Sequence, residues 1–333
     1  FSVYDHPPVW IFQKSADYSH ENSVEVLGRV DLSQVTPMNP LEATQAPNGL
    51  LLSEEAWGKQ RVNGTFSSLF AVDGLLARQP VLAAVVWWLA VIVLGWLAFP
   101  LSFVTIQGLP DRGYGLARIL SLLIVSYLAW LAASLDWLSF SNMTLWLAVM
   151  LLGLTSLIIF IRYRHEITGF IRENLAILLV IEILGVLLYV LQIGIRLGNP
   201  DVWDVIWGGE KPMDLSYFTA VLKSTTFPPY DPWYAGGYIN YYYYGFVLVG
   251  ALTRLLGILP AIAYNLIIPM LYSFTGIGVF SIAYNIVAYN QGNSKNEAKS
   301  ASLWSALSRK GLAAGLIAVV LAILVGNLAE LGV

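Results

Sequence analysis

Long apolar runs, each bounded by polar or charged residues, make up most of the chain after residue 79. An apolar helix of about 20 residues is long enough to cross about 30 Å of hydrocarbon. The pattern therefore predicts an all-α fold, a polytopic membrane helix bundle of about seven spans. The predicted spans are 81–106, 116–138, 143–162, 175–196, 238–258, 261–289 and 311–330.

Residues 1–79 have a different pattern, with scattered charges, several prolines and no strong period. Such a pattern is typical of irregular structure, and we expect only short helices near residues 53–60 and 67–77. We therefore divide the chain into a polar segment, 1–79, and a transmembrane domain, 80–333, with a long loop at 197–237. The chain begins without methionine and stops after an apolar run, so we expect the polar segment to be the end of an upstream part and the transmembrane domain to be truncated at its C-terminus.

Composition supports the membrane assignment, because 57% of the residues are hydrophobic and 12% are charged. The chain has no cysteine, which excludes disulfides and thiolate chemistry, and its three scattered histidines argue against a histidine metal site. The net charge of -3 gives no reason to expect nucleic acid as a partner.

The distribution of basic residues predicts the orientation of the spans. Arg162, Arg164 and Arg172 surround the connection between the third and fourth spans, which should therefore be cytoplasmic. We expect an integral, multi-pass protein of the cytoplasmic (inner) membrane, with residues 1–79 and the loop 197–237 on the extracytoplasmic face. One connection disagrees, since the seven-span arrangement places four basic residues outside, so either one span is miscounted or this connection does not follow the rule. These residues are Lys295, Lys299, Arg309 and Lys310.

The segment 208–245 concentrates acids, prolines and tyrosines between two apolar runs, as expected of a site at a membrane surface. Within it, Asp214 is expected to cap an interfacial helix that ends before Pro228 and Pro229. The apolar face of this helix would consist of Leu215, Phe218, Val221 and Leu222.

Three strings, VYDHP, GGEKPMD and FPPYDPWYAGGYINYYYYG, resemble the YYY-signature membrane proteins of Chloroflexi and archaea. That family is a domain of unknown function whose long external loop and many spans are similar to the GT-C glycosyltransferase superfamily. The resemblance implies a membrane glycosyltransferase that transfers a sugar from a polyprenyl-phosphate donor to an acceptor on the extracytoplasmic face.

The resemblance also implies roles for particular residues. Glu210 and Asp214 match the external-loop acid that acts as base toward the acceptor hydroxyl. A carboxylate in a partly dry site suits this role, because desolvation raises the pKa of such a group toward the working pH. The departing phosphate requires a cation, which could be Lys211, Lys223 or Arg196, or a divalent ion (Mg²⁺ or Mn²⁺) held by Asp214 and Asp231.

Each of these acids also has a purely structural interpretation. Asp214 could serve only as a helix cap, Glu210 as a surface charge paired with Lys211, and Asp231 as a turn residue.

The run Tyr241 to Tyr244 invites a ligand-binding interpretation, because aromatic rings stack on the apolar faces of sugars. Four consecutive helical positions cannot face one site, so for two of the four we favour an interfacial aromatic belt. Asn240 and Tyr241 are the preferred ligand contacts. Further substrate-binding candidates are Trp233, Tyr238 and Tyr242.

Three secondary candidates lie elsewhere in the chain. Glu182 falls in the middle of a predicted span and is either functional or hydrogen-bonded to Tyr127 or Gln192 in the bundle. Asp5 and His6 could return to the site from the polar segment.

Two other functions would use the same loop. One is a transporter or flippase for lipid-linked sugars, and the other is a non-catalytic assembly subunit whose loop binds a partner protein. An inverted repeat would favour the transporter, and we recognise none in the sequence.

Overall fold

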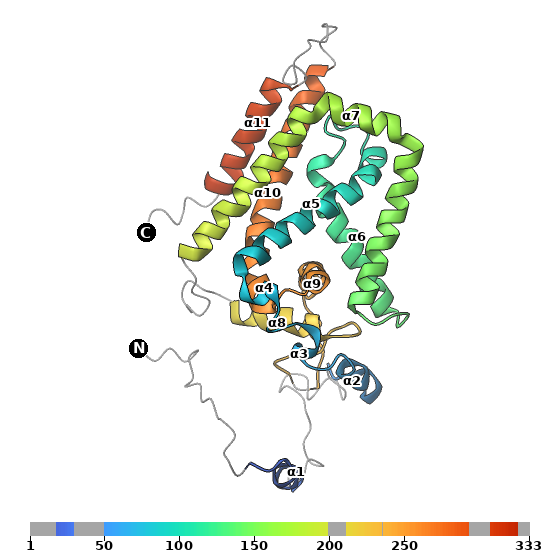
Figure 1. Ribbon diagram of the computed structural model, residues 1–333, viewed down its shortest axis with the longest axis vertical. Coiled ribbons are helices and arrows are strands. Elements are labelled where there is room, and N and C mark those ends of the chain that lie inside the picture. The colour runs from blue at the N-terminus through green and yellow to red at the C-terminus, as the bar shows by residue number, and fades with distance from the viewer. Residues whose placement is uncertain (1–17, 30–49, 199–210, 235, 293–306, 326–333) are drawn as a thin grey trace.

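The computed structural model describes residues 18–29, 50–198, 211–234, 236–292 and 307–325. Within these residues the regular elements are helices, which confirms the predicted all-α class (Figure 1). Two isolated β-bridges pair residues of the connecting segments. The helices are α1 (His20–Gly28), α2 (Glu54–Arg61), α3 (Phe66–Leu69), α4 (Leu75–Arg78), α5 (Pro80–Thr105), α6 (Tyr114–Ser134), α7 (Asn142–Gly198), α8 (Lys211–Lys223), α9 (Tyr244–Leu256), α10 (Pro260–Gly292), α11 (Arg309–Val319) and the π-helical turn η1 (Val320–Val325).

Four helices in the described part of the chain are long and apolar enough to cross a membrane: α5, α6, α7 and α10. Helix α7 has 57 residues and would be about 86 Å long if straight, far more than a bilayer is thick. It bends instead at Tyr163 and Asn174, whose backbone angles are not helical, and returns on itself (Figure 1). The expected spans 143–162 and 175–196 are thus the two limbs of one bent helix.

The expected span at 238–258 does not form. Helix α9 has 13 residues, so its length is about 20 Å, which is too short for about 30 Å of hydrocarbon. The residues before it form part of a hairpin, in which the Ile239 N–H donates to the Pro229 carbonyl at 2.8 Å. The count of seven spans is therefore not confirmed.

Buried Arg254 explains why α9 stays at the end of the bundle. Its guanidinium donates to the carbonyls of Phe140 at 2.9 Å and Leu222 at 3.1 Å, and to the Asn142 side chain at 3.1 Å. Phe140 and Asn142 lie at the start of α7, and Leu222 lies in the last turn of α8, so α9 is held at one end of the bundle.

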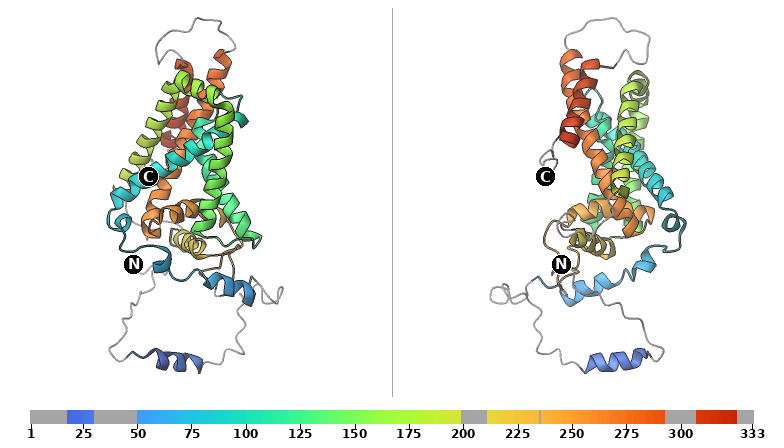
Figure 2. Two further views of the ribbon diagram at one scale, coloured as in Figure 1. Left: turned by 45° about the vertical axis from the view of Figure 1, so that its right-hand side comes forward. Right: turned by 90° about the vertical axis from the view of Figure 1, so that its left-hand side faces the viewer.

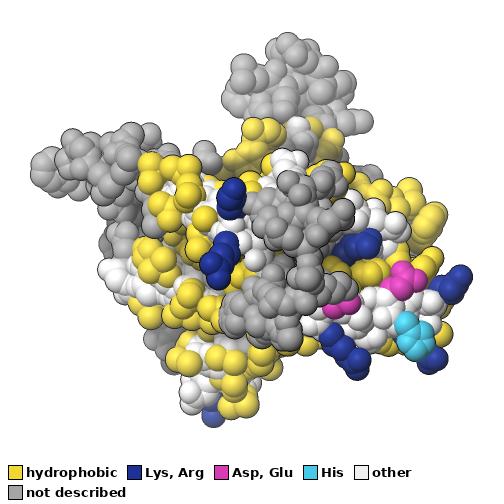
Figure 3. Space-filling model, turned by 90° about the horizontal axis from the view of Figure 1, so that it is seen from above, with side chains coloured by type: hydrophobic (Ala, Val, Ile, Leu, Met, Phe, Trp, Pro, Cys, Tyr) yellow, Lys and Arg dark blue, Asp and Glu magenta, His cyan; other side chains and the backbone are white. Residues whose placement is uncertain are grey.

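The short α9 changes where the later basic residues lie. Helix α10 starts beside α8 and α9 and ends at the opposite end of the bundle, near the bend of α7 and the start of α11 (Figures 1 and 2). Arg309 and Lys310 thus lie at the same end as Arg162, Arg164 and Arg172. Basic side chains predominate over acidic ones on this face (Figure 3), and the predicted conflict over their placement disappears for the described residues. Lys295 and Lys299 lie outside the described residues.

The helices of the bundle approach closely where glycine replaces a side chain. A Cβ atom at Gly185 of α7 would lie 2.8 Å from Ile277 of α10 and 3.1 Å from Trp88 of α5. Small residues allow this kind of contact between membrane helices, where van der Waals packing drives association. The core around it includes the fully buried side chains Trp87, Phe99, Ile181 and Phe280.

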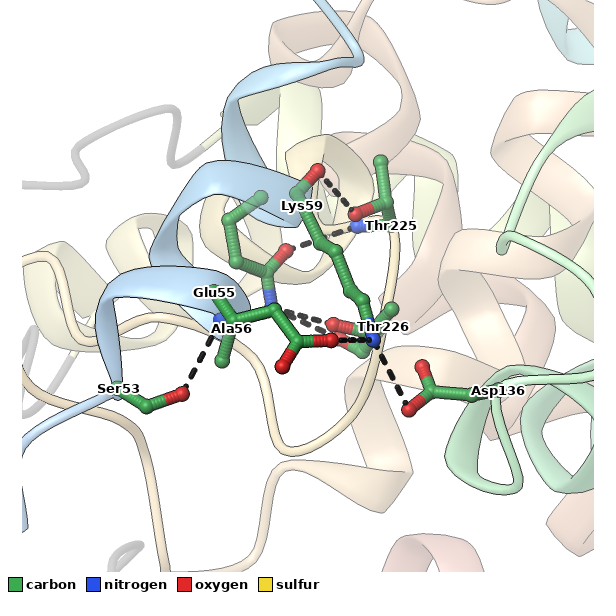
Figure 4. Close-up of polar contacts among 8 residues, drawn as sticks. Ser53, Glu55, Ala56, Lys59, Asp136, Thr225 and Thr226 are labelled. Atoms are coloured by element: carbon green, nitrogen blue, oxygen red, sulfur yellow. Dashed lines mark hydrogen bonds and ion pairs between the residues drawn. The ribbon is translucent and has the colours of Figure 1, made fainter.

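Within the polar segment, α2 packs on the connections at the α8 and α9 end (Figure 4). Ser53 caps α2 by accepting from the Ala56 N–H at 3.2 Å, as expected for a helix near residues 53–60. Lys59 pairs with Glu55 at 3.1 Å and with Asp136, before α7, at 3.2 Å. These two hydrogen bonds raise the pKa of the exposed Lys59 ammonium. The second expected helix, at 67–77, is divided into α3 and α4.

Candidate functional site

Helix α8 carries Asp214 across the end of the bundle, beneath α9 and α10 (Figure 1). Its apolar face is as predicted, with Phe218, Val221 and Leu222 buried. Asp214 itself is not the cap, because the described helix begins at Lys211 and Asp214 lies within its first turn. A negative charge in the first turn still interacts favourably with the helix dipole. The helix ends at Lys223, well before Pro228.

The half-buried Asp214 lines a cavity of about 440 Å³ between α8, α9 and α10. Its polar lining also includes Tyr242 and Tyr264, and the remaining walls are mostly apolar. The Tyr264 hydroxyl donates to the Lys211 carbonyl at 3.4 Å, which holds the start of α8 against α10. The charges of Asp214 and Arg196 both act on the phenol group of Tyr264. The arrangement places one carboxylate and two phenols around a space large enough for a sugar-sized group.

Asp231 is held in a turn. Its Oδ1 atom accepts from the backbone N–H groups of Trp233 at 2.7 Å and Tyr234 at 3.1 Å, the pattern of an Asx turn. The Trp233 indole N–H then donates to the Ser216 hydroxyl at 2.7 Å and attaches this hairpin to α8. Partial burial, and secondarily the charge of Asp231, raise the pKa of Tyr217. These contacts account for Asp231 and Trp233 without a ligand.

Among the described residues, no third histidine, aspartate or glutamate side chain joins Asp214 and Asp231 to form a metal site. Among them, no three histidine, aspartate or glutamate side chains lie close enough together to hold a metal ion. Because one oxygen of Asp231 is already occupied by backbone donors, the two predicted ligands would have to bind a divalent ion largely without other side chains. The donor set fits a resident metal poorly.

The four tyrosines divide into two pairs. Tyr243 stacks on Phe227 with ring centroids 5.8 Å apart and accepts from the Trp130 indole, and Tyr244 packs edge-on against Trp130. Tyr241 and Tyr242 are exposed, with their ring centroids 4.1 Å apart. The first pair therefore has a packing role, while the second pair is accessible, as a ligand contact requires.

Three other substrate-binding candidates, Asn240, Tyr238 and Lys223, lie in different parts of the structure. Asn240 is exposed and lines a second cavity of about 650 Å³ that also includes Tyr242 and Trp130. Tyr238 is part of the hairpin, and its N–H donates to the Leu50 carbonyl at 2.9 Å. The carbonyl of Lys223 accepts from the Asn63 side chain at 2.9 Å, so this residue joins α8 to the polar segment.

Glu182 has different partners from those expected. It accepts hydrogen bonds from Arg118 and Tyr114, both on α6, and not from Tyr127 or Gln192. Arg118 is only 3% exposed, so the two residues form a largely buried ion pair between α6 and the second limb of α7. Because the charge of Glu182 is paired inside the bundle, a structural role is sufficient to account for this residue. Glu210, Asp5 and His6 lie outside the described residues.

Sequence reasoning passed over Asp111, which is fully buried in the turn between α5 and α6. Its carboxylate accepts from Ser281 at 2.5 Å, from Asn285 at 2.8 Å and from the Gly113 N–H at 2.9 Å. An acid directly before Arg-Gly and a helix was the available signal. Since its oxygens are occupied by these donors, Asp111 joins α6 to α10 and is not a site residue.

Four long apolar helices and a polar cap at one end define a multi-pass integral membrane protein that contacts the lipid bilayer. The family model for uncharacterized membrane proteins, DUF2298, matches residues 124–332. The chain therefore belongs to this membrane protein family. No curated protein and no solved structure matches the chain.

Proposed function

We propose that this protein is a membrane glycosyltransferase of the GT-C type, which transfers a sugar from a polyprenyl-phosphate donor to an acceptor hydroxyl. The observation that carries the proposal is the cavity of about 440 Å³ at Asp214, where a half-buried carboxylate and two tyrosines, Tyr242 and Tyr264, lie between apolar walls. Such a site suits a base that acts on a sugar or polyol hydroxyl, because low polarity favours proton uptake by a carboxylate.

The proposed reaction is a direct displacement. Asp214 accepts the proton of the acceptor hydroxyl while the acceptor oxygen forms a bond to the anomeric carbon of the donor. The bond from that carbon to the lipid phosphate breaks, the phosphate keeps the electron pair, and the anomeric configuration inverts. Arg196, whose charge acts on Tyr264 as that of Asp214 does, is the cation we propose for the leaving phosphate. Glu210 remains the alternative base.

The site belongs on the extracytoplasmic face in this proposal. The bend of α7 and the start of α11 lie at the end of the bundle opposite to α8 and α9 (Figure 1), and basic residues favour the cytoplasmic side. The basic residues there are Arg162, Arg164, Arg172, Arg309 and Lys310. The inner membrane is the corresponding location.

The test is sugar transfer by purified full-length protein in proteoliposomes, with a panel of polyprenyl-phosphate sugars. We expect Asp214→Asn to fold normally and to lower the transfer rate by about 10²- to 10⁴-fold, the usual contribution of a general base. Asp73→Asn is the matched control, because Asp73 is an exposed acid paired only with Arg78 at 3.6 Å. Glu210→Gln is measured in parallel and locates the base if Asp214→Asn remains active. If no donor reacts, the glycosyltransferase assignment is wrong and lipid-sugar transport or an assembly role replaces it. If the wild type transfers sugar and both variants transfer like it, neither Asp214 nor Glu210 is the base.

A further inference from the structure

A third cavity, of about 670 Å³, lies on the outer side of the bundle between the start of α5, the end of α7 and the start of α10. Its walls are mainly aliphatic and include Val85, Leu89, Val190 and Ile193. The deeper wall is aromatic, with Trp88 stacked on Tyr189 at 4.7 Å between ring centroids. Several of the lining side chains, such as Val85 and Val190, are exposed at the surface of the helices, so the groove is open toward lipid.

One end of this groove is polar. Arg196 and Asn265 line it there, and Arg196 Nη2 donates to Asn265 Oδ1 at 2.6 Å. The Nε–H of Arg196 is buried and has no hydrogen-bond partner among the described residues. Arg196 also lies in the last turn of α7, where a cation complements the helix dipole without using its N–H donors.

The groove has the depth of about one membrane leaflet. Its lining on α7 runs from Val186 to Leu197, which corresponds to about 17 Å along a helix. The hydrocarbon core is about 30 Å thick, so a chain in this groove would extend from the surface to about the middle of the bilayer. The polar end coincides with the end of the bundle that carries α8.

We propose that this groove binds a lipid whose headgroup bears a phosphate, with the hydrocarbon chain along α5 and α7 and the phosphate at the Arg196 guanidinium. Charge complementarity supports an anionic headgroup, because arginine is the side chain best suited to pair with phosphate oxygens. The N-termini of α5 at Pro80 and of α10 at Pro260 border the same end and add partial positive charge. A neutral lipid would leave the Arg196 donors unused.

The groove and the Asp214 cavity are lined by neighbouring residues in the first turns of α10, since Asn265 lines the groove and Tyr264 lines the cavity. A lipid phosphate at Arg196 would thus lie at the same end of the bundle as Asp214. Identifying this lipid as the sugar donor rests on the proposed function, but binding in the groove does not.

The test is lipid binding by the full chain in detergent, measured by native mass spectrometry without any transfer reaction. The probes are a polyprenyl monophosphate, the matching polyprenol and inorganic phosphate. We expect the monophosphate to bind at least about tenfold more tightly than the polyprenol, as expected from hydrogen bonds to a charged group. Inorganic phosphate should neither bind detectably nor displace the lipid at equal concentration.

Variants at Arg196 and Val85 separate the contribution of the lipid headgroup to binding from that of the hydrocarbon chain. Arg196→Gln should weaken monophosphate binding about tenfold or more and leave polyprenol binding unchanged, while Arg196→Lys, which keeps the charge, should retain part of the affinity. Val85→Trp fills the groove at an exposed position and should weaken both lipids. The controls are Arg78→Gln, an exposed arginine outside the groove, and Val93→Trp, an exposed valine further along α5.

The proposal is overturned if Arg196→Gln binds the monophosphate like the wild type, if Val85→Trp has no more effect than Val93→Trp, or if inorganic phosphate competes on equal terms. Its failure is distinguishable from that of the proposed function. Asp214→Asn should bind the monophosphate normally, so normal binding with undiminished transfer would remove the catalytic role of Asp214 and leave the groove intact.

Discussion

The side-chain amide of Gln60 in α2 accepts a hydrogen bond from the Thr225 N–H, 165 residues further along the chain, at 2.9 Å. The same amide donates to the carbonyl of Thr226 at 2.9 Å. Gln60 is only 3% exposed, so these bonds are formed away from water. The polar segment therefore holds the connection that follows α8, which is the helix that carries Asp214.

Replacing Gln60 with leucine should destabilise the protein, because it leaves the buried Thr225 N–H without its acceptor. We expect a loss of about 1–3 kcal/mol in the free energy of unfolding, measured by denaturant titration in detergent. Gln79→Leu is the control, since Gln79 is exposed and caps no helix through its side chain. Equal effects of the two substitutions would show that the Gln60 contacts contribute nothing specific.

Removing only one partner of the Arg118 and Glu182 ion pair should lower the free energy of unfolding more than replacing both partners. Glu182→Leu leaves a buried guanidinium without its counter-ion, and we expect it to lower the free energy of unfolding by about 3–5 kcal/mol. The double variant Glu182→Leu with Arg118→Met should be less unstable than Glu182→Leu alone. Thermal unfolding of the three proteins in detergent measures this order. A double variant that is less stable than the single one would contradict the role of an ion pair.

Asp231→Asn should keep the hairpin, because an asparagine side-chain oxygen can accept the same two backbone N–H groups, whereas Asp231→Ala removes the acceptor. We expect sugar transfer and its response to chelators to be unchanged in Asp231→Asn. The Asp231→Ala variant should lose about 1–3 kcal/mol of stability. A large loss of transfer in Asp231→Asn that is restored by added Mg²⁺ or Mn²⁺ would instead assign Asp231 to a metal site.

The membrane topology can be tested directly, because the chain has no cysteine of its own. Single cysteines at Arg164, Lys310 and Val62 would each be exposed. With α9 too short to cross, the cysteines at positions 164 and 310 should react with a membrane-impermeant thiol reagent from the same side, and the cysteine at 62 from the other. Labelling of positions 164 and 310 from opposite sides would restore the span at 238–258.

Local sequence was enough to predict the elements whose formation depends on their own residues. The apolar runs of α5, α6, α10 and the two limbs of α7 were predicted within a few residues, as were the helix that follows Ser53 and the buried face of α8. Hydrophobic length and periodicity determine such elements, because an apolar helix or helix face can be buried against lipid or against the core whichever neighbours it has.

The span expected at 238–258 is not confirmed, for a reason outside its own residues. The apolar run 238–258 looks like a span by length, but its first residues hydrogen-bond to the hairpin and to Leu50, and Arg254 near its end is held by three oxygens from other parts of the chain. An arginine inside an apolar run was the available signal that the run does not continue through hydrocarbon.

By itself, the sequence determined that this is an all-helical membrane protein with a polar cap, because apolar length and composition decide which segments enter lipid. Only the tertiary structure decided that Glu182 pairs with Arg118, that Asp231 closes a turn, and that Asp214 of α8 lines the same cavity as Tyr264 of α10. These relationships depend on which helices become neighbours and on how far each is rotated. That choice results from close packing between segments distant in the chain, at positions such as Gly185, and no local pattern encodes it.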